Sequence, residues 1–135
     1  MKDSSSKRLE KRRFYRLKSP VQVRFRITSG DNEGGSSRLI KGKTENISEG
    51  GICLETNLVQ VDGLHISHDS SMLYKNRLEM EIDLSPDMES IRAVGEVIWY
   101  DLKKKKDQYT YNVGVWFSEI SEDDKNRLSK FLSHK

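Results

Sequence analysis

Hydrophobic and polar positions alternate along several short stretches of the chain. In residues 21–27 every second residue is apolar, and the same period of two recurs in residues 77–84. This alternation is typical of a β-strand with one buried and one solvated face. Four further segments also predict strands, namely residues 39–45, 52–56, 91–100 and 109–117.

Three segments between these strands lack a clear period, and we predict loops there. Residues 28–37 are rich in glycine and serine, which favours a loop by composition. Residues 56–76 carry scattered apolar side chains, so we expect a long loop or an insertion. Residues 102–108 contain four consecutive lysines and predict a solvated hairpin tip, which could also touch acidic lipid or a protein partner.

The end of the chain predicts a helix. Ser121 is a good N-cap, and the three acidic residues after it suit the positive end of the helix dipole. Leu128, Phe131 and Leu132 have the i, i+3, i+4 spacing of an apolar helix stripe. Six short strands and one helix predict an all-β fold with a C-terminal helix, built as a six-stranded antiparallel β-barrel.

Length and composition fit one domain. The chain has 135 residues and is 34% hydrophobic. We expect a flexible basic arm over residues 1–10 and a single domain over residues 11–135. The only cysteine is Cys53, which excludes an internal disulfide and a cysteine-based metal cluster. There is no long apolar run for a membrane span and no secretory signal, so the cytoplasm is the expected compartment.

The charge is distributed unevenly along the chain. Residues 1–26 hold ten basic and two acidic side chains, whereas the remainder holds 14 basic and 19 acidic ones. A basic arm on an acidic body suggests a negatively charged partner, such as a nucleotide, a nucleic acid or a membrane surface. A solvated tail would show the same pattern.

The basic segment ahead of the first strand contains a candidate binding motif, Arg12-x-x-x-Arg16, with Lys11 and Arg13 beside Arg12. The planar guanidinium group suits bidentate contact with phosphate or with the O6 and N7 atoms of guanine. Two arginines four residues apart can hold separate groups of one ligand. Taken alone, the motif is a weak signal, because an isolated pair of arginines at this spacing is more often a basic run without a binding role.

A second candidate motif lies between two predicted strands, Asn46-x-Ser48-x-x-Gly51. Because Asn46 and Ser48 are two positions apart, both can face the same side while Ile47 turns to the core. An amide and a hydroxyl side by side can read the hydrogen-bonding edge of a base, and glycine allows close approach. A plain hairpin connection would use the same residue types.

The sequence gives little support for a metal site or for an enzyme. His65 and His68 lie near Asp69, but a metal site needs further ligands placed by the fold, so no metal is expected. No nucleophile–base pair and no phosphate-binding glycine loop is present, which argues against an enzyme. Trp99 is typical of cross-strand packing.

Together, the two motifs and their order resemble the PilZ domain family. The segments Gly95-Glu-Val-Ile-Trp99 and Tyr111-Asn-Val-Gly-Val-Trp-Phe117 are similar to the family's fifth and sixth strands. The acidic segment after Ser121 is similar to its closing helix. The resemblance runs from Lys11 to about Leu132. The chain departs from it in residues 56–76, and in Lys11, where many relatives have another arginine.

The resemblance implies a bacterial receptor for cyclic di-GMP without catalysis or a cofactor. It also implies that the arginine arm becomes ordered over the ligand and signals to an unidentified effector protein. The residues it assigns to the ligand are Arg12 and Arg16 for phosphate and guanine, Asn46 and Ser48 for a guanine edge, and Gly51 for close approach, with Lys11, Arg13 and Trp99 as neighbours.

Two other functions remain open from sequence. A small β-barrel could bind single-stranded nucleic acid through its basic arm and strand aromatics. A PilZ-like adaptor could have lost its ligand and dock proteins only. The presence of both complete motifs favours the receptor, for which no stable nucleic-acid complex is expected.

Overall fold

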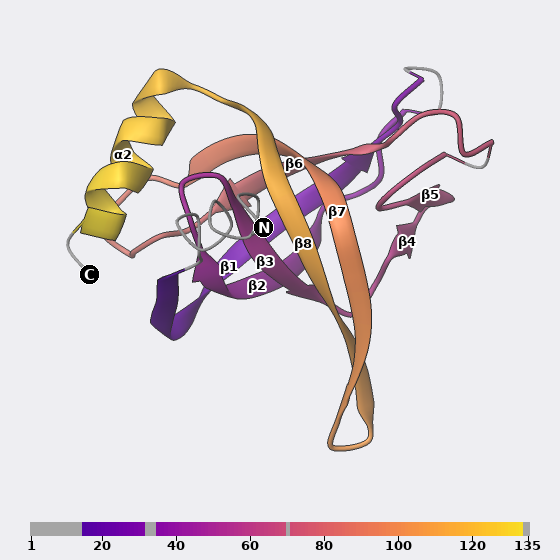
Figure 1. Cartoon of the computed structure of the whole chain (residues 1–135), viewed down its shortest axis with the longest axis horizontal. Coiled ribbons are helices and arrows are strands. Elements are labelled where there is room, and N and C mark those ends of the chain that lie inside the picture. Colours follow the sequence, from indigo (N-terminus) through magenta and orange to yellow (C-terminus); the bar gives the residue numbers. More distant parts are fainter. Residues whose placement is uncertain (1–14, 32–34, 70, 134–135) are drawn as a thin grey trace, which may run out of the picture.

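The computed structural model describes residues 15–31, 35–69 and 71–133. The expectation of a mostly β domain with one C-terminal helix is confirmed (Figure 1). The elements are β1 (Tyr15–Thr28), β2 (Ile40–Ile47), β3 (Gly51–Thr56), β4 (Gln60–Val61), β5 (Leu64–His65), β6 (Arg77–Ile82), β7 (Ile91–Lys105), β8 (Gln108–Ile120) and α2 (Glu122–Ser133).

Six strands form one antiparallel sheet in the order β1-β2-β3-β8-β7-β6. The strands at the two ends of this order, β1 and β6, also pair with each other, so the sheet closes into a barrel. Closure gives each of these six described strands a partner on both sides around the core. The inward residues of β1 are fully buried, as its alternation predicts: Val23, Phe25 and Ile27.

The outward residues of β1 form ion pairs with β6 and the segment that follows it. Arg24 lies across from Glu81, and its guanidinium donates to Asp83 at 2.7 Å. This hydrogen bond, followed by one from Ser90, holds the pKa of Asp83 below its ordinary value. The closing pair of strands therefore combines an apolar inner face with an ionic outer face.

β1 begins at Tyr15, six residues earlier than the alternation indicates. Its register with β2 shifts between Arg16 and Val21, and Leu17 within this irregular stretch is buried. The bulge interrupts the period of two, which hides the first part of the strand from a pattern search.

The lysine-rich segment predicted to be a loop is instead strand. β7 continues to Lys105 and β8 starts at Gln108. Lys106 and Asp107 join them, both with positive φ, at 48° and 68°. Two consecutive left-handed residues are the geometry of a tight type I′ hairpin turn, usually made by Asn-Gly. Without a glycine here, the turn is not visible in the sequence.

The insertion over residues 56–76 contains the small sheet of β4 and β5. The fully buried side chain of Asn76 fixes it, because its Nδ2 donates to the carbonyl of His65 at 2.8 Å while its Oδ1 accepts from the amide of Gly30 at 2.9 Å. Among the described residues, no group of three or more potential ligands could hold a metal ion, His65 and His68 included.

Helix α2 begins as predicted. The hydroxyl of Ser121 accepts from the amide of Asp124 at 3.1 Å, which caps the first turn. Leu128 and Leu132 join the core cluster of the barrel. No helix in the described part of the chain is long and apolar enough to cross a membrane.

Asp124 fastens this helix to β7. Its Oδ2 accepts from the amide of Arg92 at 3.0 Å, and its Oδ1 accepts from Arg127. Burial acts to raise the pKa of Asp124, but the hydrogen bonds from Arg92, Arg127 and Ser121 outweigh burial and lower it. A depressed pKa means that Asp124 stabilises the fold above its unfolded pKa and stops doing so as the pH falls through its folded pKa.

Asp124→Asn is therefore expected to cost about 1–3 kcal/mol of unfolding free energy at neutral pH, through loss of charge-assisted hydrogen bonds. The gap between wild type and variant should shrink as the pH falls below about 4. Urea unfolding at several pH values measures both. The exposed neighbour gives a control, because Asp123→Asn should change little. A gap independent of pH would contradict the prediction.

Candidate nucleotide-binding face

The strand register places three predicted site residues in one row across the outside of the barrel. Arg16 pairs with Asn46, Asn46 with Cys53, Cys53 with Gly114, and Gly114 with Trp99. Residues paired across strands point to the same face of a sheet. These five residues form what we call the lateral row, and it crosses β1, β2, β3, β8 and β7.

The lateral row faces outward because the neighbours of its members face inward. Ile52 and Leu54, on either side of Cys53, are fully buried. Cys53 itself is half-buried. Burial, followed by the charge of Glu55, raises the pKa of its thiol, so Cys53 is uncharged at neutral pH. The centre of the row is therefore a neutral patch between a cation at one end and an indole at the other.

At Gly114 the lateral row consists of backbone without a side chain. A Cβ atom at this position would lie 2.3 Å from Nε1 of Trp99. The indole therefore packs directly on the backbone of Gly114, while 44% of Trp99 remains exposed. An exposed aromatic face of this kind can stack on a base. The sequence named Trp99 only as a neighbour, and nothing in it showed the contact with Gly114.

Arg16 belongs to β1 and not to the preceding arm, which corrects the sequence interpretation. Its side chain is 79% exposed, and its Nη2 lies 3.6 Å from Oε1 of Glu45. An ion pair this exposed contributes little, so a ligand phosphate can replace Glu45 at small cost. The other basic candidates, Lys11, Arg12 and Arg13, lie outside the described residues.

Asn46 is positioned by a residue that the sequence analysis missed. The buried hydroxyl of Thr44 accepts from the amide of Asn46 at 3.2 Å and lies 2.6 Å from the carbonyl oxygen of Cys53. It thereby satisfies backbone groups where Glu45 bulges out of the β2–β3 register. A threonine within a strand carries no sequence signal for such a role.

Ser48 was predicted to face solvent, but in the structure its side chain is buried. It is only 6% exposed, and its hydroxyl accepts from the amides of Gly50 and Gly51 at 3.1 Å each. Serine commonly closes a turn in this manner. The free hydroxyl expected from the alternation with Asn46 is thus engaged in holding the β2–β3 turn.

Gly51 also has a structural reason to be glycine. A Cβ atom there would lie 2.1 Å from the carbonyl oxygen of Val115. Glycine at this position therefore lets β3 pair closely with β8. The resemblance implies that a ligand approaches this glycine closely, whereas in this structure the approaching group is a neighbouring strand.

Ser48→Ala is expected to lower the free energy of unfolding by about 1–3 kcal/mol, because the amides of Gly50 and Gly51 lose their acceptor. This revises the sequence-based expectation that the free fold would be indifferent to the change. Urea denaturation measures the effect, with Ser133→Ala at the exposed end of α2 as control. Equal stability of the two variants would contradict the role given to Ser48.

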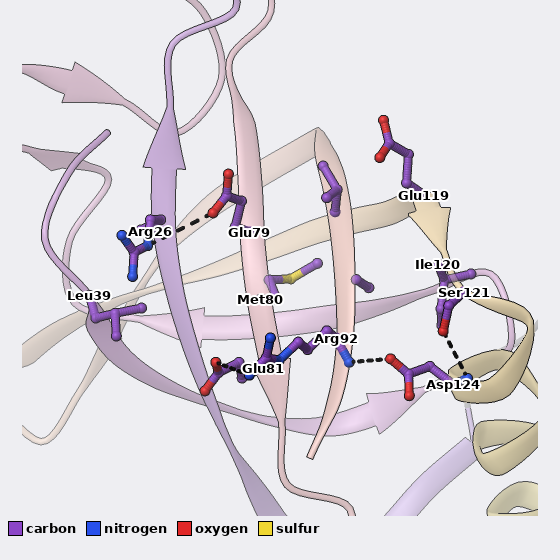
Figure 2. A pocket seen from close by; sticks show the side chains of 12 residues that line it. Arg26, Leu39, Glu79, Met80, Glu81, Arg92, Glu119, Ile120, Ser121 and Asp124 are labelled. Carbon is purple, nitrogen blue, oxygen red and sulfur yellow. Dashed lines mark hydrogen bonds and ion pairs between the residues drawn. The ribbon is translucent and has the colours of Figure 1, made fainter. Parts of the chain in front are cut away.

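A separate hollow of about 780 Å³ lies over β1, β6, β7 and the start of α2 (Figure 2). Two arginines line the hollow, and both already form ion pairs: Arg26 lies 3.9 Å from Glu79, and Arg92 lies 3.7 Å from Glu81. Glu119 adds a further carboxylate. An excess of negative charge disfavours a phosphate ligand there. Of the predicted ligand residues, the five that the structure describes (Arg16, Asn46, Ser48, Gly51 and Trp99) do not line this hollow.

The family model of the PilZ domain matches residues 10–134. The chain belongs to the PilZ domain family. PilZ domains are receptor or adaptor domains, and the closed sheet with its C-terminal helix agrees with that fold. A comparison with curated protein sequences found no match.

Solved structures with the PilZ-like fold come from several bacteria. MrkH of K. pneumonia in its apo state is 17% identical, with a TM-score of 0.64 over 90% of this chain and 48% of MrkH. The Bacillus subtilis inhibitor of motility (MotI/DgrA) is 18% identical, with a TM-score of 0.54 over 90% and 48%. The chain thus spans about half the length of these two proteins.

The Escherichia coli YcgR PilZ domain, solved with c-di-GMP, is 14% identical. The match has a TM-score of 0.58 and covers 91% of this chain and 89% of that one. At these identities the likeness shows the fold alone.

Proposed function

We propose that this PilZ domain is a cytoplasmic receptor for cyclic di-GMP and that the ligand binds along the lateral row. The observation that carries the proposal is the pairing of Arg16 with Asn46. This pairing joins the last arginine of the first motif to the first residue of the second, although 30 positions separate them in sequence. The family membership and the YcgR domain solved with c-di-GMP support the same ligand.

The chemistry of the row suits a ligand with two phosphates and two guanines. The guanidinium of Arg16 offers a fork of N–H donors to a phosphate or to guanine O6 and N7. The amide of Asn46 offers both an acceptor and a donor to a guanine edge. Trp99 offers an aromatic face at the far end, where the absence of a side chain at Gly114 lets the indole pack on the backbone. Ser48 and Gly51 shape the turn that holds Asn46 in place.

We further propose that the segment carrying Lys11, Arg12 and Arg13 closes over the bound ligand. Arg12 lies four residues before Arg16, whose backbone is held in β1. Two phosphate charges give these cations a partner for charge-assisted hydrogen bonds. Closure would change the surface that an effector protein contacts, which gives an output without catalysis.

The deciding experiment is titration calorimetry with cyclic di-GMP, with GTP and a short single-stranded RNA as controls. Binding of cyclic di-GMP alone supports the proposal. No binding at about 100 μM, equivalent to about −5.5 kcal/mol, would overturn it and leave an adaptor without ligand. RNA affinity that rises with oligonucleotide length and falls steeply with salt would instead favour the single-stranded nucleic-acid barrel.

Hydrogen exchange tests the closing segment separately. Amides in residues 8–14 are expected to gain protection when saturating cyclic di-GMP is added, because the ligand supplies the countercharge. Amides of β1 near Val23 serve as an internal control, since they are paired on both sides with or without ligand. Unchanged exchange in residues 8–14, with binding confirmed by calorimetry, would reject closure but keep the receptor.

A further inference from the structure

The β7–β8 hairpin extends well beyond the barrel. β6 pairs with β7 only over residues 91–95, and β3 pairs with β8 only over residues 111–116. Residues 103–105 and 108–110 therefore pair only with each other in the described part of the chain, and residues 100–102 pair only with residues 111–113, which also pair with β3. We call residues 100–110 the ribbon. It projects away from the closed sheet as a two-stranded finger (Figure 1).

One face of the ribbon is apolar and aromatic. Strand alternation places Tyr100, Leu102 and Lys104 on this face, and the register places Tyr109 opposite Lys104. Leu102 is 53% and Tyr109 is 56% exposed. The face continues the inner face of the barrel beyond the point where the core covers it. The ring of Tyr100 is only partly covered, with its centroid 5.6 Å from that of His65 in β5 and 6.3 Å from that of Tyr111.

Basic charge gathers at the tip of the same ribbon. Residues 103–106 are four consecutive lysines. The ammonium of Lys104 lies 5.8 Å from the ring centroid of Tyr109, so cation and aromatic ring are side by side on the apolar face. Strand alternation places Asp101 and Lys103 on the opposite face, and Lys106 and Asp107 form the turn.

The composition of the ribbon favours a lipid partner over a protein partner. Protein interfaces are enriched in arginine and depleted in lysine, whereas every cation of the ribbon is lysine. Lysine attracts anionic headgroups while its stem lies along apolar surface, and tyrosine places its ring at the boundary between hydrocarbon and water. A projecting finger can also reach a flat surface without obstruction by the barrel.

We propose that the ribbon binds the surface of an anionic lipid bilayer. Leu102 and Tyr109 enter the headgroup region, and the tip lysines contact lipid phosphates and carboxylates. The ribbon begins next to Trp99, which is one end of the lateral row, but none of the ribbon residues belongs to that row. The inference therefore stands independently of the proposed ligand.

Sedimentation with vesicles tests the inference, using the whole chain and vesicles of phosphatidylcholine with or without about one third phosphatidylserine. Wild type should bind only the anionic vesicles. Lys104→Gln/Lys106→Gln should weaken this binding roughly thirtyfold, from about 1 kcal/mol per lysine. Leu102→Gln should weaken it by roughly tenfold through lost apolar burial. The matched control is Lys125→Gln/Lys130→Gln on α2, which removes the same charge and should bind like wild type.

Several results would overturn the inference. Equal binding to neutral and anionic vesicles would remove the role of the lysines. An equal loss in the ribbon and α2 double variants would show a response to net charge. Anionic binding that survives the ribbon variants would place the contact elsewhere, for example on the basic N-terminal segment. Ribbon-dependent binding of a single-stranded oligonucleotide without vesicle binding would assign the surface to nucleic acid.

Discussion

Arg16→Ala is expected to weaken cyclic di-GMP binding by about 2–5 kcal/mol while leaving the melting temperature of the free protein nearly unchanged. The large binding effect follows because the proposed ligand contacts the guanidinium through charge-assisted hydrogen bonds. The small stability effect follows because the side chain is exposed and its pair with Glu45 is weak. Calorimetry and thermal unfolding of the same preparations measure both.

Two further arginine variants sharpen this test. Arg16→Lys keeps the charge but loses the planar fork, so it should bind with intermediate affinity. Arg38→Ala removes an equally charged, exposed side chain whose partner is Asp62 in the insertion, and it should bind like wild type. A double-mutant cycle with Asn46→Ala then asks whether the paired residues share one ligand. Wild-type affinity in Arg16→Ala would remove the lateral row from the proposed site.

Gly51→Ala is expected to destabilise the free protein by about 3 kcal/mol or more, at the upper end of overpacking effects. The new methyl group would meet the carbonyl of Val115 and the Cα of Trp116, both backbone atoms that cannot rotate away. β3 must therefore separate locally from β8. Thermal and urea unfolding without any ligand measure the loss.

The adjacent glycine supplies the control for this substitution. A Cβ at Gly50 would meet only the hydroxyl of Ser48 at 3.9 Å, an ordinary contact, so Gly50→Ala should be nearly neutral. If both variants are equally stable, the pairing of β3 with β8 does not explain the glycine. Weak ligand binding by the Gly51→Ala variant would be informative about the site only if this variant is shown to be folded.

Much of the fold follows from local patterns. The alternation around Phe25 and Met80 predicts strands that the structure confirms, and the capping serine predicts the start of α2. The patterns fail where the physical signal is interrupted. The bulge after Arg16 breaks the period of two, and the Lys106-Asp107 turn lacks the glycine that usually marks such a hairpin.

The candidate site is harder to predict from the sequence, because it depends on the register in which the strands pair. Arg16 and Asn46 were each identified from a motif, but their pairing is set by hydrogen bonds between strands far apart in sequence. The orientation of Ser48 was predicted wrongly because a turn, and not a continuing strand, follows Ile47. The contact between Trp99 and Gly114 depends on a second register shift, in β7.

The topology of the barrel also bears on the order in which it assembles. β7 and β8 are joined by two residues and pair over twelve registered positions, so their contacts are local. Closure of the sheet instead brings Phe25 opposite Met80, 55 residues later in the chain. Because chain entropy opposes distant contacts more than local ones, the hairpin should form early and the β1–β6 seam last. The insertion over residues 56–76 lies inside the segment spanned by that seam, so its length sets part of the kinetic barrier to folding.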